Sequence, residues 1–207
     1  MYLKKSITAV AGLLAITASA QADSLGTRED QRGAITRVDK GLMQLGAEST
    51  FILGYSQEAD DSSFMTNTQV SAVFRYFIKK NLGLSGRFGP VYRKEGDARD
   101  LGFAGSVWAN LFLRWGEGVF FTPGAGLGFL STQRDIPVNE TTVARSDVIG
   151  GTAGAEFLLA VFLNPRFSLV GGPEFLFSVG NTTPEQGDGE SFTSLNGAFK
   201  VGVFYAF

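Results

Sequence analysis

The sequence contains neither cysteine nor histidine among its 207 residues. Without cysteine, the chain can form no disulfide and no iron–sulfur site, has no thiolate nucleophile, and lacks the lipid-bearing cysteine of a lipoprotein. Without histidine, it lacks the side chain that most often acts as acid, base or metal ligand near neutral pH. We therefore expect no cofactor, no metal ion and no catalytic site that depends on either residue.

Long apolar runs are scarce, and the clearest one lies near the N-terminus. Lys4 and Lys5 precede the apolar run 7–17, and small residues fill most of 18–22. This pattern predicts a Sec-type signal peptide over 1–22, cleaved after Ala22, with a cut after Ala20 as the alternative. A membrane-anchoring helix is the competing interpretation, but the run is shorter than the roughly 20 apolar residues that a spanning helix needs.

Beyond residue 22, glycine or a polar residue interrupts every apolar segment within a few positions. A membrane-spanning chain of this kind must therefore be a closed β-barrel, the other structure that satisfies every backbone group in lipid. Charge is modest, because loss of Lys4 and Lys5 with the signal peptide reduces the 18 basic residues to 16, against 20 acidic ones. The resulting net charge of −4 argues against a nucleic-acid partner.

The last fifteen residues, 193–207, alternate between two kinds of side chain. One register is apolar and holds Leu195, Gly197, Phe199, Val201, Val203, Tyr205 and Phe207. The other register is mostly small or polar and holds Lys200. Because successive strand side chains point to opposite faces, one face of this segment suits lipid and the other a polar interior. The segment therefore predicts a strand of a transmembrane barrel.

Seven further segments alternate in the same way, which makes eight predicted strands. They cover residues 42–55, 64–78, 82–92, 101–115, 121–129, 149–161 and 167–179. The breaks alternate between polar ones, at 57–63, 93–99, 131–146 and 181–190, and tight ones, at 79–81, 116–118 and 164–165. This predicts an all-β, eight-stranded antiparallel transmembrane barrel over 41–207, with short periplasmic turns and longer extracellular loops. The polar segment 23–40 is predicted to be a periplasmic lead-in to the barrel.

The charged residues of the predicted strands share one register. They are Glu48, Arg75, Arg87, Arg114, Glu156, Glu174 and Lys200, and the opposite register carries no charge in these spans. A soluble lipocalin-like or sandwich protein, the competing interpretation, would show the reverse arrangement. An eight-stranded barrel has an interior only wide enough for side chains, so we expect these groups to pair with one another. The pairing is either structural, since buried charges need partners, or part of a path for ions or water.

Glycine and proline add two smaller expectations. The inward glycines of 124–128 are expected to make room for bulky neighbours such as Trp108 or Phe112. Three prolines fall on the outward register, where a missing ladder donor predicts bulges or strand ends. These prolines are Pro90, Pro123 and Pro173.

With these strands, breaks and the terminal aromatic in place, the chain resembles the small outer-membrane β-barrels of Gram-negative bacteria, of the OmpA transmembrane-domain, OmpX and OmpW type. The resemblance covers residues 42–207 and implies a porin-like protein integral to the outer membrane. It implies that Phe207, with Tyr205 and Val203, is a signal recognised by the barrel-assembly machinery. The other implied partners are periplasmic chaperones, outer-membrane lipid and lipopolysaccharide, around a monomeric barrel.

Two functions fit this resemblance. The first is a non-enzymatic barrel with a structural or surface-interaction role through its extracellular loops, for a ligand that the sequence does not identify. The alternative is a narrow channel for ions or small solutes. An enzyme fits least, because barrel lipases, lipid A deacylases and omptin-type proteases resemble one another in using a catalytic histidine, which this chain lacks.

Overall fold

A computed structural model describes residues 27–29, 35–58, 61–95, 98–137, 143–185 and 189–207. The predicted signal peptide, 1–22, lies outside the described residues. No helix in the described part of the chain is long and apolar enough to cross a membrane.

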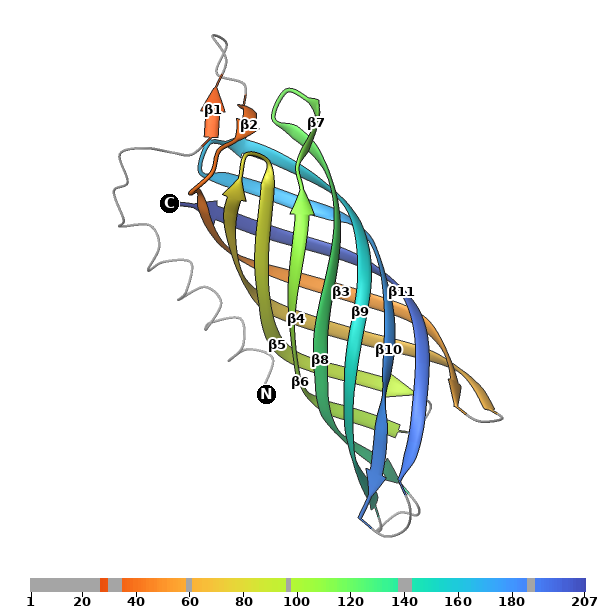
Figure 1. Cartoon of the computed structure of the whole chain (residues 1–207). Coiled ribbons are helices and arrows are strands. Elements are labelled where there is room, and N and C mark those ends of the chain that lie inside the picture. Colours follow the sequence, from red (N-terminus) through yellow and green to blue (C-terminus); the bar gives the residue numbers. More distant parts are fainter. Residues whose placement is uncertain (1–26, 30–34, 59–60, 96–97, 138–142, 186–188) are drawn as a thin grey trace, which may run out of the picture.

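Antiparallel strands form nearly the whole structure (Figure 1). They are β1 (Thr27–Glu29), β2 (Ile35–Val38), β3 (Met43–Glu58), β4 (Asp61–Lys79), β5 (Leu82–Glu95), β6 (Ala98–Leu111), β7 (Leu113–Gly116), β8 (Val119–Pro137), β9 (Val143–Asn164), β10 (Phe167–Pro184) and β11 (Glu190–Ala206). β3 to β6 pair in sequence order, as do β7 to β11, and the pairs β11–β3 and β6–β8 close the sheet. Because β6 and β7 are successive pieces of one wall strand, the described residues confirm the predicted eight-stranded barrel.

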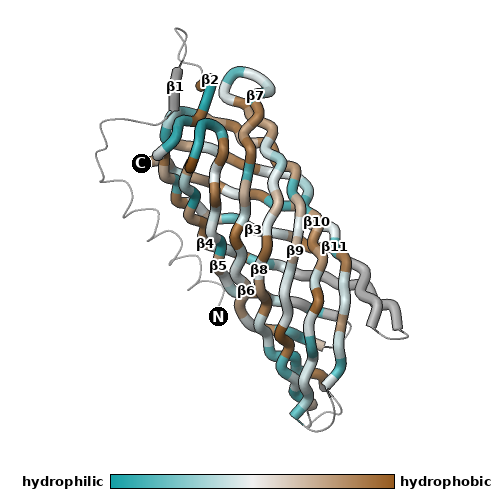
Figure 2. Tube along the Cα trace, in the orientation of Figure 1, coloured by the Kyte–Doolittle hydropathy of each residue, from teal (hydrophilic) through white to brown (hydrophobic). Residues whose placement is uncertain are grey.

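The two faces of the wall differ as the alternation predicts. Leu127 and Val107 face outward and are 70% and 62% exposed, whereas the inward Phe120 is 0% exposed. Figure 2 shows the same change from hydrophobic to hydrophilic residue along individual strands. An exposed outer wall of this kind requires lipid around it, because water would leave a large apolar surface unburied.

The tight turns, the C-terminus, β1 and β2 lie together at one end of the barrel, as Figure 1 shows. We call it the periplasmic end, because outer-membrane barrels place their short turns there. The turn between β4 and β5 places Asn81 at a positive φ of 59°, and the next turn places Gly118 at 66°. Asn81 also fixes the lead-in, since its N–H donates to the carbonyl of Val38 at 2.8 Å and its side-chain oxygen accepts from the N–H of Val38 at 2.9 Å.

The strands continue into segments where we predicted polar loops. β8 extends to Pro137 and β9 begins at Val143, so most of the predicted loop 131–146 is strand. The predicted breaks at 57–63, 93–99 and 181–190 are shortened in the same way. Outside lipid both faces of a strand meet water, so the hydrophobic alternation ends there while the backbone ladder continues.

The predicted strand 101–115 is divided at Phe112. This residue lies between β6 and β7, and its N–H donates to the carbonyl of Asn81 at 2.7 Å instead of to the neighbouring ladder. Its ring is 1% exposed and points into the barrel. The N–H of Phe112 therefore joins the neighbouring turn, while its side chain keeps the inward direction of the strand.

The prediction of bulges or strand ends at the outward prolines is wrong for Pro90 and Pro173. The β4–β5 register is the same on both sides of Pro90, and the β9–β10 register is the same on both sides of Pro173. Each proline instead lies where the ladder to one neighbour is interrupted, which is where its missing N–H costs least. The prediction is also wrong for Pro123, which lies inside β8 opposite the break between β6 and β7, with the same register on both sides.

Candidate functional site

Six of the seven predicted lumen residues meet in the middle of the barrel. They are Glu48 on β3, Arg75 on β4, Arg87 on β5, Glu156 on β9, Glu174 on β10 and Lys200 on β11. Their strands are consecutive in the sheet, and none of the six residues is more than 6% exposed. Three carboxylates and three cations give this set, which we call the lumen network, a balanced formal charge.

Lys200 joins two carboxylates that would otherwise repel each other. Glu156 and Glu174 are direct partners across β9 and β10, where like charges are unfavourable. The Nζ of Lys200 donates to Oε2 of Glu156 and to Oε1 of Glu174, at 2.7 Å in each case. The ammonium therefore converts a repulsive pair into two charge-assisted hydrogen bonds.

Arg87 contacts the same carboxylates from the opposite side. Its Nη2 lies 2.7 Å from Oε1 of Glu156, and its Nη1 lies 3.6 Å from Oε1 of Glu174. Its Nε lies 2.9 Å from Oε2 of Glu48. A planar guanidinium suits this role because its donors spread in a fixed plane toward several acceptors.

Arg75 lies on the periplasmic side of the network. Its Nη2 is 3.8 Å from Glu48, while its Nε donates to Ser85 at 3.1 Å and its Nη1 to Gln44 at 3.2 Å. The guanidinium carbon lies 4.2 Å from the ring centroid of Phe204. Arg75 therefore connects the charged part of the lumen to the aromatic side chains nearer the periplasmic end.

Trp108 covers the two other cations. Its ring centroid lies 4.5 Å from the guanidinium carbon of Arg87 and 4.9 Å from Nζ of Lys200. The inward Gly126 makes this position possible, because an added Cβ would overlap the indole. The prediction that inward glycines admit Trp108 agrees with this contact.

An aromatic cluster fills the periplasmic end of the lumen. The rings of Phe77 and Phe112 are 4.9 Å apart, those of Phe112 and Phe120 are 6.2 Å apart, and those of Phe120 and Phe162 are 5.5 Å apart. The lead-in completes the cluster, since Val38 and Ile35 are buried within it. We call this group the periplasmic plug.

A small cavity lies on the outer side of the lumen network. Its volume is about 80 Å³, and Arg87, Glu174 and Lys200 are among the residues that line it. Hydroxyl and amide side chains form much of its wall, including Thr50 and Asn196. A space of this size and polarity suits a few water molecules.

A second buried ion pair lies nearer the outer end, between Asp100 on β6 and Arg134 on β8. The two residues are direct partners in the ladder, and Nε of Arg134 donates to Oδ1 of Asp100 at 3.0 Å. Both are buried, at 2% and 6% exposure. We did not predict this pair, although the inward register of each strand, continued beyond the predicted strand end, includes both positions.

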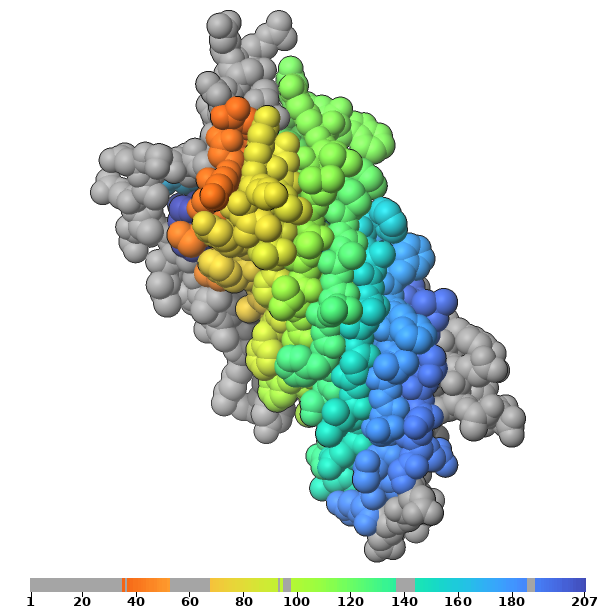
Figure 3. All heavy atoms as spheres, viewed as in Figure 1, coloured from red at the N-terminus to blue at the C-terminus, as the bar shows by residue number. Residues whose placement is uncertain are grey.

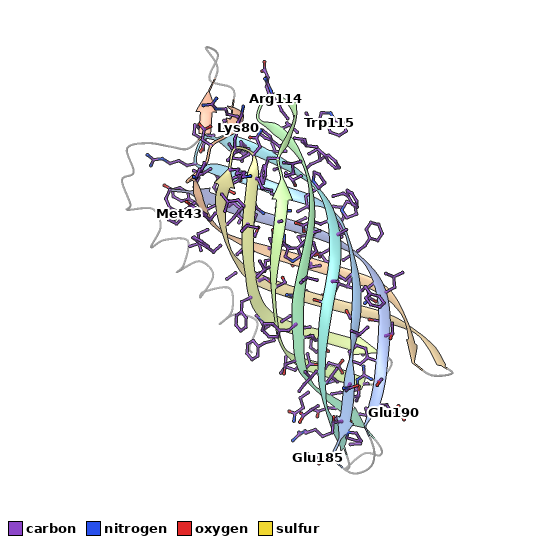
Figure 4. All side chains as sticks on the ribbon, viewed as in Figure 1. Met43, Lys80, Arg114, Trp115, Glu185 and Glu190 are labelled. Atoms are coloured by element: carbon purple, nitrogen blue, oxygen red, sulfur yellow. The ribbon has the colours of Figure 1, made fainter. Side chains whose placement is uncertain are left out.

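The prediction that Arg114 belongs to the lumen network is wrong. Arg114 is exposed, and its Nε is 3.4 Å from the carbonyl oxygen of Gly116. Figure 4 shows Arg114 and Trp115 projecting at the periplasmic end, well away from the middle of the barrel. Its register is inward, but β7 has passed the mouth of the barrel at this point, so no lumen surrounds the side chain.

Sequence reasoning also missed the neutral members of the network. Asn110 donates from Nδ2 to Oε1 of Glu156, and Ser85 donates to Oδ1 of Asn110 at 3.2 Å. These residues lie in the same inward register as the charges. The inward register is therefore the sequence signal for these neutral partners as well as for the charges.

The three residues of the predicted assembly signal end the closing strand. Val203 pairs with Leu169 and Tyr205 pairs with Phe167, both on β10. The N–H of Phe207 donates to the carbonyl of Met43 at 3.1 Å. Their recognition by assembly machinery stays a prediction.

The lumen network offers little chemistry beyond ion pairing. Its carboxylates are engaged by cations, and within the described residues no group of acidic side chains is arranged to hold a metal ion. A reacting group would also have to fit into the cavity of about 80 Å³ beside the network.

Known structures share this fold. Neisserial surface protein A (NspA) has a TM-score of 0.51 and 13% identity, over 81% of this chain and 100% of that one. The outer membrane protein OprG from Pseudomonas aeruginosa has a TM-score of 0.52 and 12% identity, over 82% and 97%. No protein-family model and no curated protein matches the chain by sequence, so the likeness is one of fold.

The closed sheet, the apolar outer wall and these likenesses define the class. The chain is an eight-stranded transmembrane β-barrel of the outer-membrane type. The integral outer-membrane location predicted from the sequence agrees with this fold.

Proposed function

We propose that this protein is a non-conducting outer-membrane barrel that acts as a structural element of the membrane and through the surface it presents outside. The observation that supports this most is the filled lumen. To pass from outside to the periplasm, a solute would have to cross the lumen network, whose ion pairs are as short as 2.7 Å, and then the periplasmic plug. Moving either aside would separate buried charges or expose buried aromatic rings.

The proposed interaction surface is the polar part of the barrel that extends beyond lipid. β8, β9 and β10 have 19, 22 and 18 residues. A tilted spanning strand needs only about 9 to 11 residues, so these strands rise above the membrane. Figure 4 shows Glu185 and Glu190 at this outer end, opposite Arg114 and Lys80. Part of the surface is therefore a rigid strand wall in addition to the loops.

We also propose that the protein is not an enzyme. The carboxylates of the lumen network are held by Arg87 and Lys200, and the sequence has no histidine or cysteine to serve as a nucleophile or base. Purified protein should show no turnover of phospholipid or lipid A. Reproducible hydrolysis would contradict this part of the proposal.

Recording in planar lipid bilayers tests the closed lumen. The wild-type barrel should give no stable conductance steps, whereas an open barrel would give them at every insertion. The wild type is compared with the Arg87→Ala variant, which removes the cation that contacts three carboxylates. This variant should show a higher ion current through the barrel. Stable wild-type steps would favour the alternative, a narrow channel for ions or small solutes.

The absence of cysteine allows a simple test of orientation. Single cysteines at Asp147 and Glu190, both exposed at the outer end, should react with a membrane-impermeant maleimide on intact cells. A cysteine at Lys80, exposed at the periplasmic end, should react only after the outer membrane is opened. The reverse pattern would contradict the assignment of the two ends.

A further inference from the structure

A row of charged residues crosses the outward face of four neighbouring strands. Lys94 on β5 pairs with Arg99 on β6, Arg99 pairs with Asp135 on β8, and Asp135 pairs with Arg145 on β9. Lys94, Arg99 and Arg145 are exposed, and Asp135 is half-exposed. The row therefore presents three positive charges and one negative charge at the outer end of one side of the barrel.

The single carboxylate of the row, that of Asp135, pairs with the arginine at one end of the row. Oδ1 of Asp135 accepts a hydrogen bond from Nε of Arg145 at 3.0 Å. Lys94 and Arg99 face each other across β5 and β6, and within the described residues neither has an ion pair. Two like charges directly opposite each other are unfavourable, so this position favours an anion that contacts both.

The Lys94–Arg99 pair lies directly above the apolar wall. The next outward residues toward the membrane are Tyr92 and Leu101, which pair with each other and are 46% and 65% exposed. Two residues of strand correspond to roughly 7 Å. On β8, by contrast, Ser131 and Gln133 separate Phe129 from Asp135. The pair is therefore at the height of lipid headgroups, while the ion pair between β8 and β9 stands farther from the apolar surface.

The same side of the barrel has a hollow in its apolar wall. It has a volume of about 510 Å³ and extends from Leu45 on β3 across β4, β5 and β6 to β8, with Phe88, Val107, Leu127 and Phe129 in its wall. Outward Gly86 leaves part of its floor bare, because a Cβ added there would meet no atom within 4 Å. Figure 3 shows the face on which these strands lie side by side.

The depth of the hollow matches that of an acyl chain. From Arg99, six residues of β6 lead to Gly105 at the edge of the hollow. Six residues extend roughly 20 Å along a strand, which is roughly 15 Å of depth at a tilt near 40°. One leaflet is about half of the roughly 30 Å hydrocarbon thickness, so a lipid with its headgroup at Arg99 would end in the hollow.

From the pair and the hollow together, we propose that this side of the barrel is a binding site for a phosphorylated lipid of the outer leaflet, that is, the lipid A part of lipopolysaccharide. Lys94 and Arg99 bind a phosphate group between them, and an acyl chain lies in the hollow. Lysine and arginine suit this ligand because both make charge-assisted hydrogen bonds to phosphate oxygens. The inference goes beyond the proposed function, because it requires the barrel to lie in the membrane but not its lumen to be closed.

Binding of fluorescent, bisphosphorylated lipid A to the refolded barrel in non-ionic detergent tests this site. The Lys94→Gln/Arg99→Gln variant should bind about twenty-fivefold more weakly, because each basic residue near an anionic headgroup contributes a factor of about five to the affinity. The matched control is Lys79→Gln/Lys80→Gln, which removes two exposed basic residues at the periplasmic end and should bind as the wild type does. A gel shift between heated and unheated samples verifies that each variant is folded.

Three results would overturn the proposal. The first is that both double variants lose the same affinity for lipid A. The second is that the wild type binds fully dephosphorylated lipid A as tightly as bisphosphorylated lipid A. The third is that pyrophosphate alone binds through Lys94 and Arg99 as tightly as lipid A does. The last result would indicate a site for free phosphate instead of lipid. The Gly86→Leu variant tests the hollow separately, because it should weaken lipid A binding several-fold and leave pyrophosphate binding unchanged. Unchanged lipid A affinity in Gly86→Leu would contradict the acyl-chain part.

Discussion

Glu156 and Glu174 lie directly opposite each other on β9 and β10, and the Nζ of Lys200 is 2.7 Å from an oxygen of each. Two carboxylates in this relationship cannot both stay ionised in a narrow lumen without a cation between them. The position of Lys200 therefore decides whether the middle of the barrel is stable. Arg87, from the opposite side, strengthens the same arrangement.

The first prediction concerns removal of this cation. Lys200→Met should lower the free energy of unfolding by about 3 to 5 kcal/mol, because it leaves Glu156 and Glu174 facing each other with less positive charge. Urea unfolding of the refolded barrel in lipid vesicles measures the change. Adding Glu174→Gln to Lys200→Met should recover part of the loss, because it removes one of the two opposing charges.

The control for this prediction is Lys79→Met, at an exposed position near the periplasmic turn. It removes the same charge and should change the free energy of unfolding by less than about 0.5 kcal/mol. Equal effects of Lys79→Met and Lys200→Met would mean that the ion pairs of the lumen add nothing specific to stability.

The second prediction compares two depths on the outward face of β8. Leu127→Arg, at a residue 70% exposed in the apolar wall, should cost about 2 to 4 kcal/mol of folding free energy in vesicles. Gln133→Arg, on the same face but nearer the outer end, should cost only about 0 to 1 kcal/mol. Urea unfolding in vesicles measures the loss of folding free energy in each variant. Equal losses would show that the apolar band does not end between Leu127 and Gln133.

The sequence predicted which face of the sheet each side chain occupies better than its depth along the barrel axis. Alternation alone placed Glu48, Glu156 and Lys200 on the inward face. In the structure, Nζ of Lys200 lies 2.7 Å from Oε2 of Glu156 and 3.8 Å from Oε2 of Glu48. The same alternation placed Arg114 inward, yet this residue lies beyond the periplasmic mouth. Strand parity gives the direction of a side chain, whereas its depth depends on the tilt and stagger of the whole sheet.

The ends of the strands were predicted least well, for a related reason. Asp100 and Arg134 lie where lipid no longer imposes an apolar face, so both fell outside the predicted strands. The backbone ladder extends past this boundary because neighbouring strands, and not lipid, supply its hydrogen-bond partners. A pairing that depends on residues 34 positions apart leaves no local signal in the sequence.

The third prediction concerns the space beneath Trp108. Gly126→Ala should cost about 1 to 3 kcal/mol, because the new methyl group would overlap the indole and displace it from Arg87 and Lys200. Gly151→Ala, on the next strand, meets no atom within 4 Å and should be neutral or stabilising by up to about 1 kcal/mol. Urea midpoints of the two variants measure the difference, and a neutral Gly126→Ala would show that the indole moves without cost.

The last prediction separates assembly from stability at the C-terminus. Deleting Phe207 removes one backbone hydrogen bond to Met43, 3.1 Å long, at the very end of the ladder. The folded barrel should lose only about 1 kcal/mol as a result. If the terminal aromatic is a recognition signal, the same deletion should greatly reduce the amount of folded protein in the outer membrane of cells. Phe207→Tyr, which keeps an aromatic terminus, should restore it. The measurement is the heat-modifiable fraction in isolated membranes, compared with the yield of refolding in vitro. A deletion variant that assembles normally in cells would remove Phe207 from the assembly signal, and one that fails equally in both settings would make its role structural.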